Sequence, residues 1–338
     1  MILDRYLLSL KINFMRKISC LVVILGLFMA CQNKPSQRII AESSGNLNEL
    51  NVIVENEDWN GKLGEHIRDV FAADFKGLPQ QEPQFNLRQI PPEIFTGFAR
   101  KNRIFIKFEN TKQPQVQRLV DSFAQPQVGY LFGANSTTAF DSLLRANANR
   151  IINDLQATEI KERQRRIAKS LKDDQAIRDE FNISLNLPTA YRYAKTEDNF
   201  IWLRKDIKHG SMELTIYEVP AQSIEKNDSI LKNIIQVRDS IGKVKIPGPT
   251  EESFMSTEKA YAPYLFETKI DGKFAYEVKG TWEVKGFFMG GPFLTYAVKN
   301  STKNTYLMLE GFVFKPSASK RTQMIEVEAI LRSAQFIK

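Results

Sequence analysis

Cysteine and histidine are scarce in this sequence, with two of each among 338 residues. So few thiols exclude a fold held by several disulfides, and so few imidazoles exclude a zinc site built from Cys and His. The sequence also lacks the Gly-x-Ser-x-Gly elbow, the His-Glu-x-x-His helix and the Gly-x-x-x-x-Gly-Lys-Ser/Thr phosphate loop. We therefore expect no metal ion, no cofactor and no catalytic residue of these kinds. Carboxylates brought together by folding would leave no trace in the sequence.

Long hydrophobic runs are scarce too, and Ile18–Ala30 is too short to cross a bilayer, which takes ~20 residues. This run follows the basic segment Met15–Lys17 and ends directly before Cys31. That order is typical of a secretory signal whose start is Met15. A cysteine at this boundary resembles a bacterial lipobox, in which the cysteine carries lipid and becomes the mature N-terminus. We expect residues 1–31 to be a signal peptide with its lipidation site at Cys31; a plain signal peptide is the alternative.

The excess of basic residues is modest, because 47 Lys and Arg face 39 Asp and Glu, for a net charge of +8. In a cytosolic protein such a charge would suggest nucleic acid as a partner. An exported protein meets little nucleic acid, so we expect none to bind. The expected contact with the membrane is the N-terminal lipid.

The first half of the mature chain alternates between strand and helix patterns. Residues 32–46 are mostly polar and predict a tether. Strands are predicted over 47–55, 84–90 and 102–108, with a helix over 59–75 that Asp58 caps and a short helix after Pro91. This alternation predicts a small α/β domain over residues 47–136.

A long helix is predicted over residues 137–180, bridging the two halves of the chain. It includes the basic stretch Lys161–Lys172, which carries six basic residues and one glutamate. One interpretation is a basic face for anionic lipid headgroups or another acidic polymer. The favoured interpretation is an ordinary solvated helix face, because four acidic residues follow closely.

The second half, residues 181–338, has the pattern of an antiparallel sheet. Apolar residues alternate from Phe181 to Leu187, and further strands are predicted over 199–204 and 213–219. Asp271-Gly272 between two strand patterns predicts a tight hairpin. Helices are predicted over 224–241 and after Ser319, which we expect to cap the second one. The whole chain is therefore predicted to be α+β: a small α/β domain, a long bridging helix, and an antiparallel sheet flanked by helices.

Two loops are candidate contacts for a ligand or partner. One holds Pro247, Gly248, Pro249 and Glu251, and the other holds Gly290, Gly291 and Phe293. Glycine lets backbone amides approach a ligand, and aromatic rings can line a pocket. The favoured interpretation of the second loop is structural: a tight turn or bulge between strands.

Several segments of the second half must be considered together. They are Asn199–Lys205, Arg238–Ser240, Pro247–Glu251, Met289–Phe293, Glu310–Phe314, Lys320-Arg321 and Glu328–Leu331. In combination they resemble domain of unknown function family 4837, lipoproteins of the Bacteroidetes. The family has no established activity, so the resemblance implies no catalytic residue. The second half is also similar to the PsbP-like arrangement, a central antiparallel sheet flanked by helices, and this likeness of fold carries no function.

The resemblance implies a lipoprotein of the cell envelope. Surface-exported lipoproteins of that phylum tend to carry an acidic run after the cysteine, and none follows Cys31. We therefore expect an outer-membrane protein that faces the periplasm and binds or scaffolds an envelope protein or glycan.

Two alternatives stay open. One is a hydrolase of polysaccharide or peptidoglycan that uses carboxylates assembled by folding, and the other is a purely structural envelope component. A cleft with two facing carboxylates of raised pKa would favour the hydrolase. An apolar patch without convergent polar groups would favour the binding module.

Overall fold

The computed structural model describes residues 40–337. The expected signal peptide, Cys31 and most of the expected tether over residues 32–46 lie outside this range. From Ala41 onward the chain forms one compact unit. Among the helices of residues 40–337, none is both long and hydrophobic enough to cross a bilayer.

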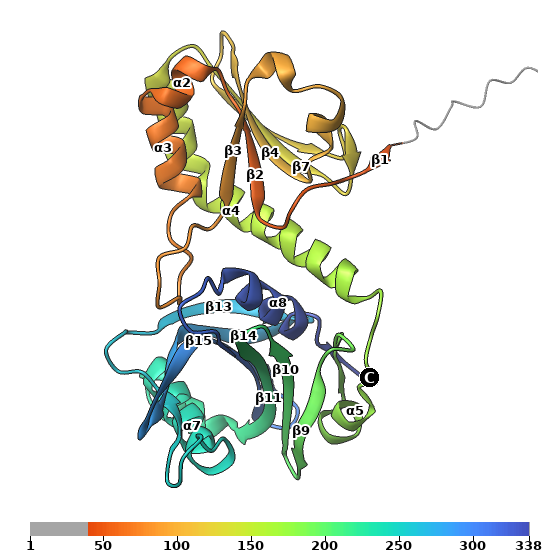
Figure 1. The fold of residues 1–338 in the computed structure, drawn as a ribbon, viewed down its shortest axis with the longest axis vertical. Helices are drawn as coiled ribbons and strands as arrows, with labels where there is room; N and C mark the ends of the chain where they lie inside the picture. The colour runs from red at the N-terminus through yellow and green to blue at the C-terminus, as the bar shows by residue number, and fades with distance from the viewer. Residues whose placement is uncertain (1–39, 338) are drawn as a thin grey trace, which may run out of the picture. The chain divides into compact units, whose positions relative to one another are not determined.

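The first part of this unit is a five-stranded, mainly parallel sheet (Figure 1). Its strands, in sheet order, are β3 (Asn86–Ile90), β2 (Glu49–Ile53), β4 (Ile104–Asn110), β7 (Val128–Ala134) and β5 (Gln115–Val120). Only β5 runs antiparallel to its neighbour. Both faces of the sheet are covered by apolar side chains, which is why the parallel strands read as nearly continuous hydrophobic runs. A short parallel pair, β1 (Ala41–Glu42) and β6 (Ala124–Gln125), lies beside it.

The helix predicted over residues 59–75 is two helices, α2 (Asn56–Asn60) and α3 (Lys62–Phe71). The break is at Gly61, whose extended backbone ends the first helix and begins the second. The prediction that Asp58 caps the helix is wrong, because Asp58 lies inside α2. The short helix predicted after Pro91 is present as two 3-10 turns, η1 (Pro92–Ile94) and η2 (Gly97–Lys101).

The long helix α4 (Thr137–Ile167) contributes to two hydrophobic cores. Its apolar residues between 140 and 155 pack with the first sheet, whereas Ile160 and Ile167 pack with the second. The prediction of one helix over 137–180 is wrong beyond Ile167, and α5 (Gln175–Phe181) is separate. Between them the backbone N–H of Lys172 donates to the carbonyl of Leu187 at 2.8 Å. A continuous helix would have used that N–H within itself.

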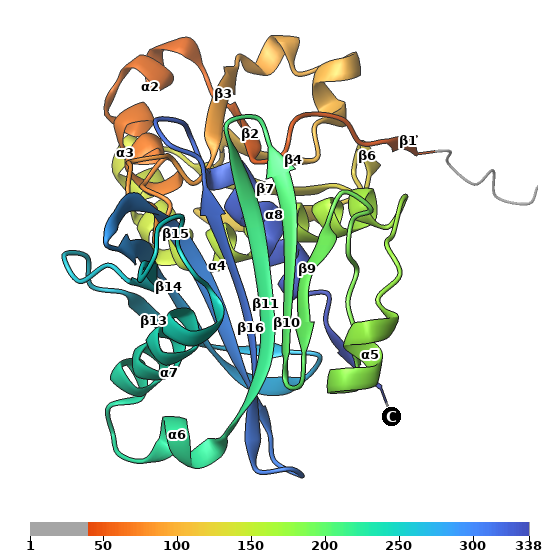
Figure 2. The ribbon, with the colours of Figure 1, turned by 60° about the horizontal axis from the view of Figure 1, so that its bottom comes forward.

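The second part is an eight-stranded sheet that is antiparallel throughout (Figure 2). In sheet order its strands are β12 (Phe254–Thr257), β14 (Lys273–Lys285), β15 (Phe287–Asn300), β16 (Thr305–Phe314), β11 (Gly210–Pro220), β10 (Phe200–Ile207) and β9 (Arg192–Glu197), and β13 (Tyr264–Ile270) also pairs with β14. Helix α8 (Arg321–Leu331) packs on one face, whereas α6 (Ala221–Glu225) and α7 (Ile230–Lys245) pack on the other. The prediction of an α+β protein is confirmed.

Of the local features predicted for this second part, some are present and others are not. The hairpin at Asp271-Gly272 is present, and both residues have the positive φ, 46° and 74°, that a two-residue turn of this kind needs. The alternation from Phe181 to Leu187 matches alternating burial, but only β8 (Ile183–Ser184) pairs, with β17 (Gln335–Phe336). The prediction that Ser319 caps the last helix is wrong, because Lys320 is the N-cap residue and its side chain makes no cap.

The cap of α8 comes from a residue far away in sequence. The Glu82 carboxylate accepts hydrogen bonds from the backbone N–H groups of Lys320 and Arg321, at 2.6 and 3.0 Å. Arg321 in turn donates from its guanidinium to the carbonyl of Pro83. A carboxylate at a helix N-terminus satisfies free N–H groups and complements the helix dipole. This contact joins the loop before β3 to the second sheet's helix.

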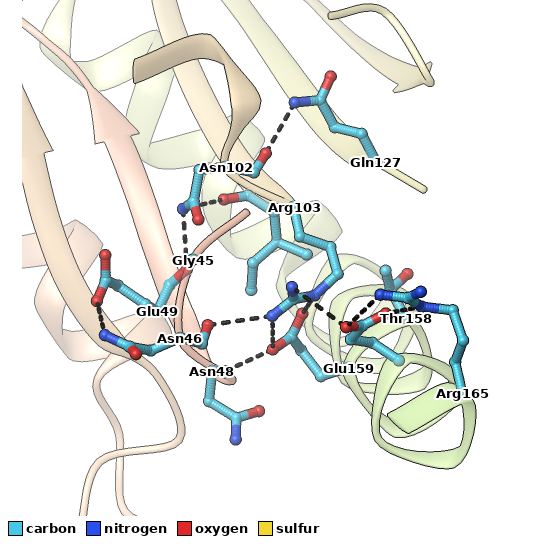
Figure 3. A network of polar contacts seen from close by, with 12 residues as sticks. Gly45, Asn46, Asn48, Glu49, Asn102, Arg103, Gln127, Thr158, Glu159 and Arg165 are labelled. Carbon is cyan, nitrogen blue, oxygen red and sulfur yellow. Dashed lines mark hydrogen bonds and ion pairs between the residues drawn. The ribbon is translucent and has the colours of Figure 1, made fainter. Parts of the chain in front are cut away.

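A buried ion pair holds α4 to the start of β2 and to β4 (Figure 3). The guanidinium of Arg103 contacts both carboxylate oxygens of Glu159, at 2.7 and 3.1 Å, and also donates to the carbonyl of Asn46. Glu159 accepts a further hydrogen bond from the backbone N–H of Asn48. Arg103 and Glu159 are each only 1% exposed. The pair is therefore fully desolvated, and backbone groups of the segment before β2 complete its hydrogen bonds.

The basic stretch Lys161–Lys172 is not a free basic face. Arg163 pairs with Glu326 of α8, and Arg165 and Arg166 both pair with the buried Glu162. Each of these three arginines therefore has a carboxylate partner within the protein, and Arg165 and Arg166 share theirs. The interpretation as a solvated face holds for Lys161, Arg165, Arg166 and Lys169, which are all exposed.

Candidate functional site

A cavity of about 520 Å³ opens on the α7 side of the second sheet. We call it the aromatic cleft. Residues from β10, β11, β14–β16 and the segment after α7 line it, among them Trp202, Arg204, Glu213, Pro247, Gly248, Pro249, Trp282, Met289, Phe312 and Phe314. Its volume falls within the range of small-molecule and peptide side-chain pockets, roughly 300–1,000 Å³.

One carboxylate anchors the polar side of the aromatic cleft. Trp202 and Arg204 lie two residues apart on β10, so both side chains face the cleft, and Arg204 stands opposite Glu213 on β11. The Trp202 indole N–H donates to Glu213 Oε2 at 2.8 Å, and Arg204 Nη1 lies 3.4 Å from Glu213 Oε1. Glu213 is only 3% exposed. The ligand would therefore meet a carboxyl group already held by one hydrogen bond and one ion pair.

Burial raises the pKa of the Glu213 carboxyl to about 7. Ser211, Arg204 and the Trp202 hydrogen bond act in the opposite direction and do not compensate for the lost hydration. Near neutral pH the group is therefore present both as a carboxylate, which only accepts hydrogen bonds, and as a carboxylic acid, which also donates one.

Aromatic rings make the apolar wall of the cleft. Trp282 packs edge-on against Phe312, with ring centroids 5.4 Å apart, and against Phe314 at 6.5 Å. The indole N–H of Trp282 is buried and has no hydrogen-bond partner within residues 40–337. A buried donor without a partner is rare in folded proteins. A ligand with a carbonyl or hydroxyl oxygen could satisfy it.

The structure separates the seven residues that the sequence singled out in its loops. Pro247, Gly248 and Pro249 line the cleft. Their turn is held by a hydrogen bond of 2.8 Å from the Gly248 N–H to the Ser253 carbonyl. A Cβ at Gly248 would lie 2.4 Å from Ser253 Oγ, so only glycine fits there. Glu251 is exposed at the far side of that turn and does not line the cleft.

The second loop is part of a strand. Gly290 and Gly291 lie within β15 and pair with Glu283 and Trp282 of β14, and the register shifts just before them, where Phe288 and Met289 have no partner on β14. The loop therefore holds a bulge, as its structural interpretation expects, but the bulge precedes the two glycines. A Cβ at Gly291 would come within 2.0 Å of the Val313 carbonyl. Phe293 is fully buried, and the Arg238 guanidinium lies 3.9 Å from its ring centroid. Its role is to pack under the cleft, not to contact a ligand.

The cleft's central residues, Trp202, Arg204 and Glu213, were missed by sequence reasoning. Their only local signal is a glutamate and an arginine placed among alternating apolar residues of two predicted strands. That signal indicates charged residues on partly buried strands, but it does not show that β10 and β11 are neighbours in the sheet.

A buried ion pair lies beneath the cleft on the same face of the sheet. Arg238 of α7 reaches Glu310 of β16, with Nε 3.0 Å from Oε1, and both side chains are 1% exposed. The two atoms are close but not aligned for a hydrogen bond, so we describe the contact as an ion pair. Thr295 and Thr257 complete it with hydrogen bonds of 3.0 and 2.9 Å. Burial raises the pKa of Glu310, and Arg238 opposes that rise.

A second cavity, of about 670 Å³, lies between α4, the loop before β3, and the β13–β14 edge with α8. We call it the polar cleft; it shares no lining residue with the aromatic cleft. Four paired charges line part of it. Glu277 and Glu328 each contact both Lys279 and Arg332, at 2.7–3.5 Å. Burial disfavours the charged form of Glu328, but Lys279 and Arg332 outweigh it and lower the pKa.

A metal site is not evident in the described range. Within residues 40–337, no three His, Cys, Asp or Glu side chains gather as ligands for an ion.

Family models match both parts of the chain. Residues 43–168 match the model described as Domain of unknown function (DUF8532), and residues 170–333 match Domain of unknown function (DUF4837). The two matches meet at the turn that ends α4, which is where the packing changes from the first sheet to the second.

Other comparisons add little. No curated protein matches the sequence. Among solved structures, the Ran-binding protein Mog1p of Saccharomyces cerevisiae is similar at 7% identity and a TM-score of 0.30, over 46% of this chain and 91% of Mog1p. The resemblance to family 4837 is confirmed: residues 170–333, which carry the aromatic cleft, match the model of the domain of unknown function family DUF4837.

Proposed function

We propose that this chain is a lipid-anchored binding protein of the bacterial envelope, attached through Cys31 to the outer membrane and facing the periplasm. Its aromatic cleft holds an apolar or aromatic side chain of a partner protein. The observation that supports this is the combination of aromatic walls with one buried, hydrogen-bonded carboxyl group, Glu213. Apolar walls supply affinity, and a few placed polar groups supply orientation.

Binding is favoured over hydrolysis by the arrangement of carboxylates. Hydrolysis of a glycosidic bond needs two carboxyl groups on either side of it, one with a raised pKa. Among the residues that line the aromatic cleft, Glu213 is the only acidic one. Glu310 also has a raised pKa, but it is buried and occupied by Arg238 and Thr295. The lowered pKa of Glu328 suits an ion pair and not a general acid.

Photo-crosslinking in native envelopes tests the proposal. A photo-reactive amino acid in place of Met289, on the cleft wall, should crosslink to one envelope protein. Trp202→Ala, which removes an aromatic wall, should lower that yield by about tenfold or more, as loss of a central aromatic anchor does. Tyr261→Ala, at an exposed aromatic outside the cleft, is the matched control.

The same cells report on the anchor, because Cys31→Ser protein should appear in the soluble fraction and lose the crosslink. A crosslink that survives Trp202→Ala unchanged, or turnover of a glycan or peptide by the purified chain, would contradict the proposal.

The pH dependence of stability tests the environment of Glu213. In the unfolded chain this carboxyl titrates near 4.5 and in the folded chain near 7, so the folded state binds the extra proton between these values. The free energy of unfolding should therefore fall as pH rises from about 4.5 to 7, by up to about 3 kcal/mol from this group.

Glu213→Gln, which cannot titrate, should remove that part of the slope and be the more stable protein at pH 8. Urea unfolding at several pH values measures it. Glu251→Gln, which removes an exposed carboxylate, controls for loss of charge alone. Parallel profiles for wild type and Glu213→Gln would show that Glu213 is not desolvated.

A further inference from the structure

The polar cleft differs from the aromatic cleft in what lines it. One wall is the face of α4 that carries Asn149, Asn153 and Gln156, spaced so that they project from one side of the helix. The side chains of Asn149 and Asn153 are exposed and make no hydrogen bond within residues 40–337, and the Gln156 amide donates to the Gln84 side chain at 3.1 Å. Each primary amide offers two donors and an acceptor, as a row of ligand hydroxyls would require.

Positive charge lines opposite walls of this cleft. Lys161 comes from α4 and Lys269 from β13, both are exposed, and neither has a carboxylate partner within residues 40–337. The four charges of the Glu277, Lys279, Glu328 and Arg332 group neutralise one another. Glu267 also lines the cleft without a cationic partner in that range, so three unpaired lysines (Lys76, Lys161 and Lys269) against this one glutamate leave a net charge of +2 for acidic groups of a ligand.

An aromatic ring completes the cleft. Phe266 of β13 lines it and stacks nearly parallel to Tyr264, with centroids 6.3 Å apart and 9° between planes. The Lys76 ammonium lies 5.4 Å from the centre of the Phe266 ring. A flat aromatic face beside amides and cations suits the C–H face of a sugar ring.

We propose that the polar cleft binds an acidic oligosaccharide, with its hydroxyls on the α4 amides and its carboxylates near Lys161 and Lys269. This gives the proposed envelope protein a second ligand. It does not depend on the aromatic cleft, because the two cavities have no lining residue in common. Failure of one proposal therefore leaves the other to be judged on its own.

Titration calorimetry with the full chain in detergent tests the inference. The probes are a galacturonate hexamer, a neutral maltohexaose of the same length, a glutamate hexapeptide of the same charge, and inorganic phosphate. We expect saturable 1:1 binding of the galacturonate hexamer that weakens with salt, because exposed charges are screened. The other three probes should bind at least about tenfold more weakly, a loss of about 1.4 kcal/mol.

Paired variants locate the site. Lys161→Gln with Lys269→Gln should weaken binding about fivefold, since each exposed ion pair contributes roughly 0.2–1 kcal/mol. Lys169→Gln with Lys208→Gln removes the same charge from exposed positions outside the cleft and should leave binding unchanged. Asn153→Leu should weaken it without a change of charge, and Trp202→Ala should not.

The inference is overturned by absence of saturable binding, by equal effects of the two lysine pairs, or by equal affinity for the glutamate hexapeptide or phosphate. Equal affinity for the peptide would show that the site binds negative charge and does not recognise the sugar. Each variant's thermal unfolding is compared with wild type, and Lys→Gln changes at exposed positions should leave it unaltered within about 0.5 kcal/mol.

Discussion

Arg238→Met is expected to lower the free energy of unfolding by about 3–5 kcal/mol, because it leaves the Glu310 carboxyl buried without its cation. Glu310 must then take up a proton or remain charged in an apolar layer, and both outcomes are costly. Arg238 also donates to Thr257 and packs on the Phe293 ring, and these contacts are lost as well. Urea-induced unfolding followed by tryptophan fluorescence measures the effect.

Further variants separate the contribution of the Arg238–Glu310 ion pair from that of each side chain by itself. Glu310→Leu should be at least as destabilising as Arg238→Met, because a buried guanidinium cannot lose its proton. The double variant Arg238→Met with Glu310→Leu should be less destabilised than either single variant, since both charges are then gone. Arg192→Met, at an ion pair with Asp206 that is about 60% exposed, is the control and should cost less than about 1 kcal/mol. Additive losses in the double variant would contradict this account.

Arg103→Met should cost about 3–5 kcal/mol in the free energy of unfolding, for the same physical reason in the first sheet. Glu159 would lose both contacts with the guanidinium and keep only the backbone N–H of Asn48. Arg103 also holds the Asn46 carbonyl, so the segment leading into β2 should loosen (Figure 3). Amide hydrogen exchange of residues 46–53 should therefore accelerate along with the loss of global stability.

An exposed pair on the same helix provides the matched control. Arg118 contacts Asp154 of α4 with two hydrogen bonds, at 2.7 and 3.0 Å, but its side chain is 43% exposed. Arg118→Met should cost about 1 kcal/mol or less and leave exchange at residues 46–53 unchanged. Similar losses of unfolding free energy for Arg103→Met and Arg118→Met would contradict this account, because burial would then not determine how much the Arg103–Glu159 pair contributes to stability.

The elements that local patterns predicted are those in which neighbouring residues decide the outcome. The hairpin at Asp271-Gly272 forms because these two residues accept positive φ where other residues resist it. The strands at β2, β4, β10 and β11 follow from runs of alternating or continuous apolar residues. The bulge expected in the loop of Gly290 and Gly291 is present, but it lies at Phe288 and Met289, directly before the two glycines.

Predictions failed where a distant residue replaced the local one. The helix α4 was expected to continue to residue 180, but it ends at Ile167 because Lys172 pairs with Leu187. Ser319 was expected to cap α8, but Glu82 supplies the carboxylate from 238 residues away.

The sequence by itself determined the class of this protein: α+β, with the hairpin and most strands in place, and few thiols or imidazoles for metal or disulfide chemistry. Tertiary structure alone decided the candidate sites. Glu213 acquires its raised pKa because β10 and β11 pair and bury it beside Trp202 and Arg204, and the polar cleft exists because α4 faces β13. Local patterns set backbone preferences over a few residues, whereas desolvation and charge pairing depend on which segments meet in space.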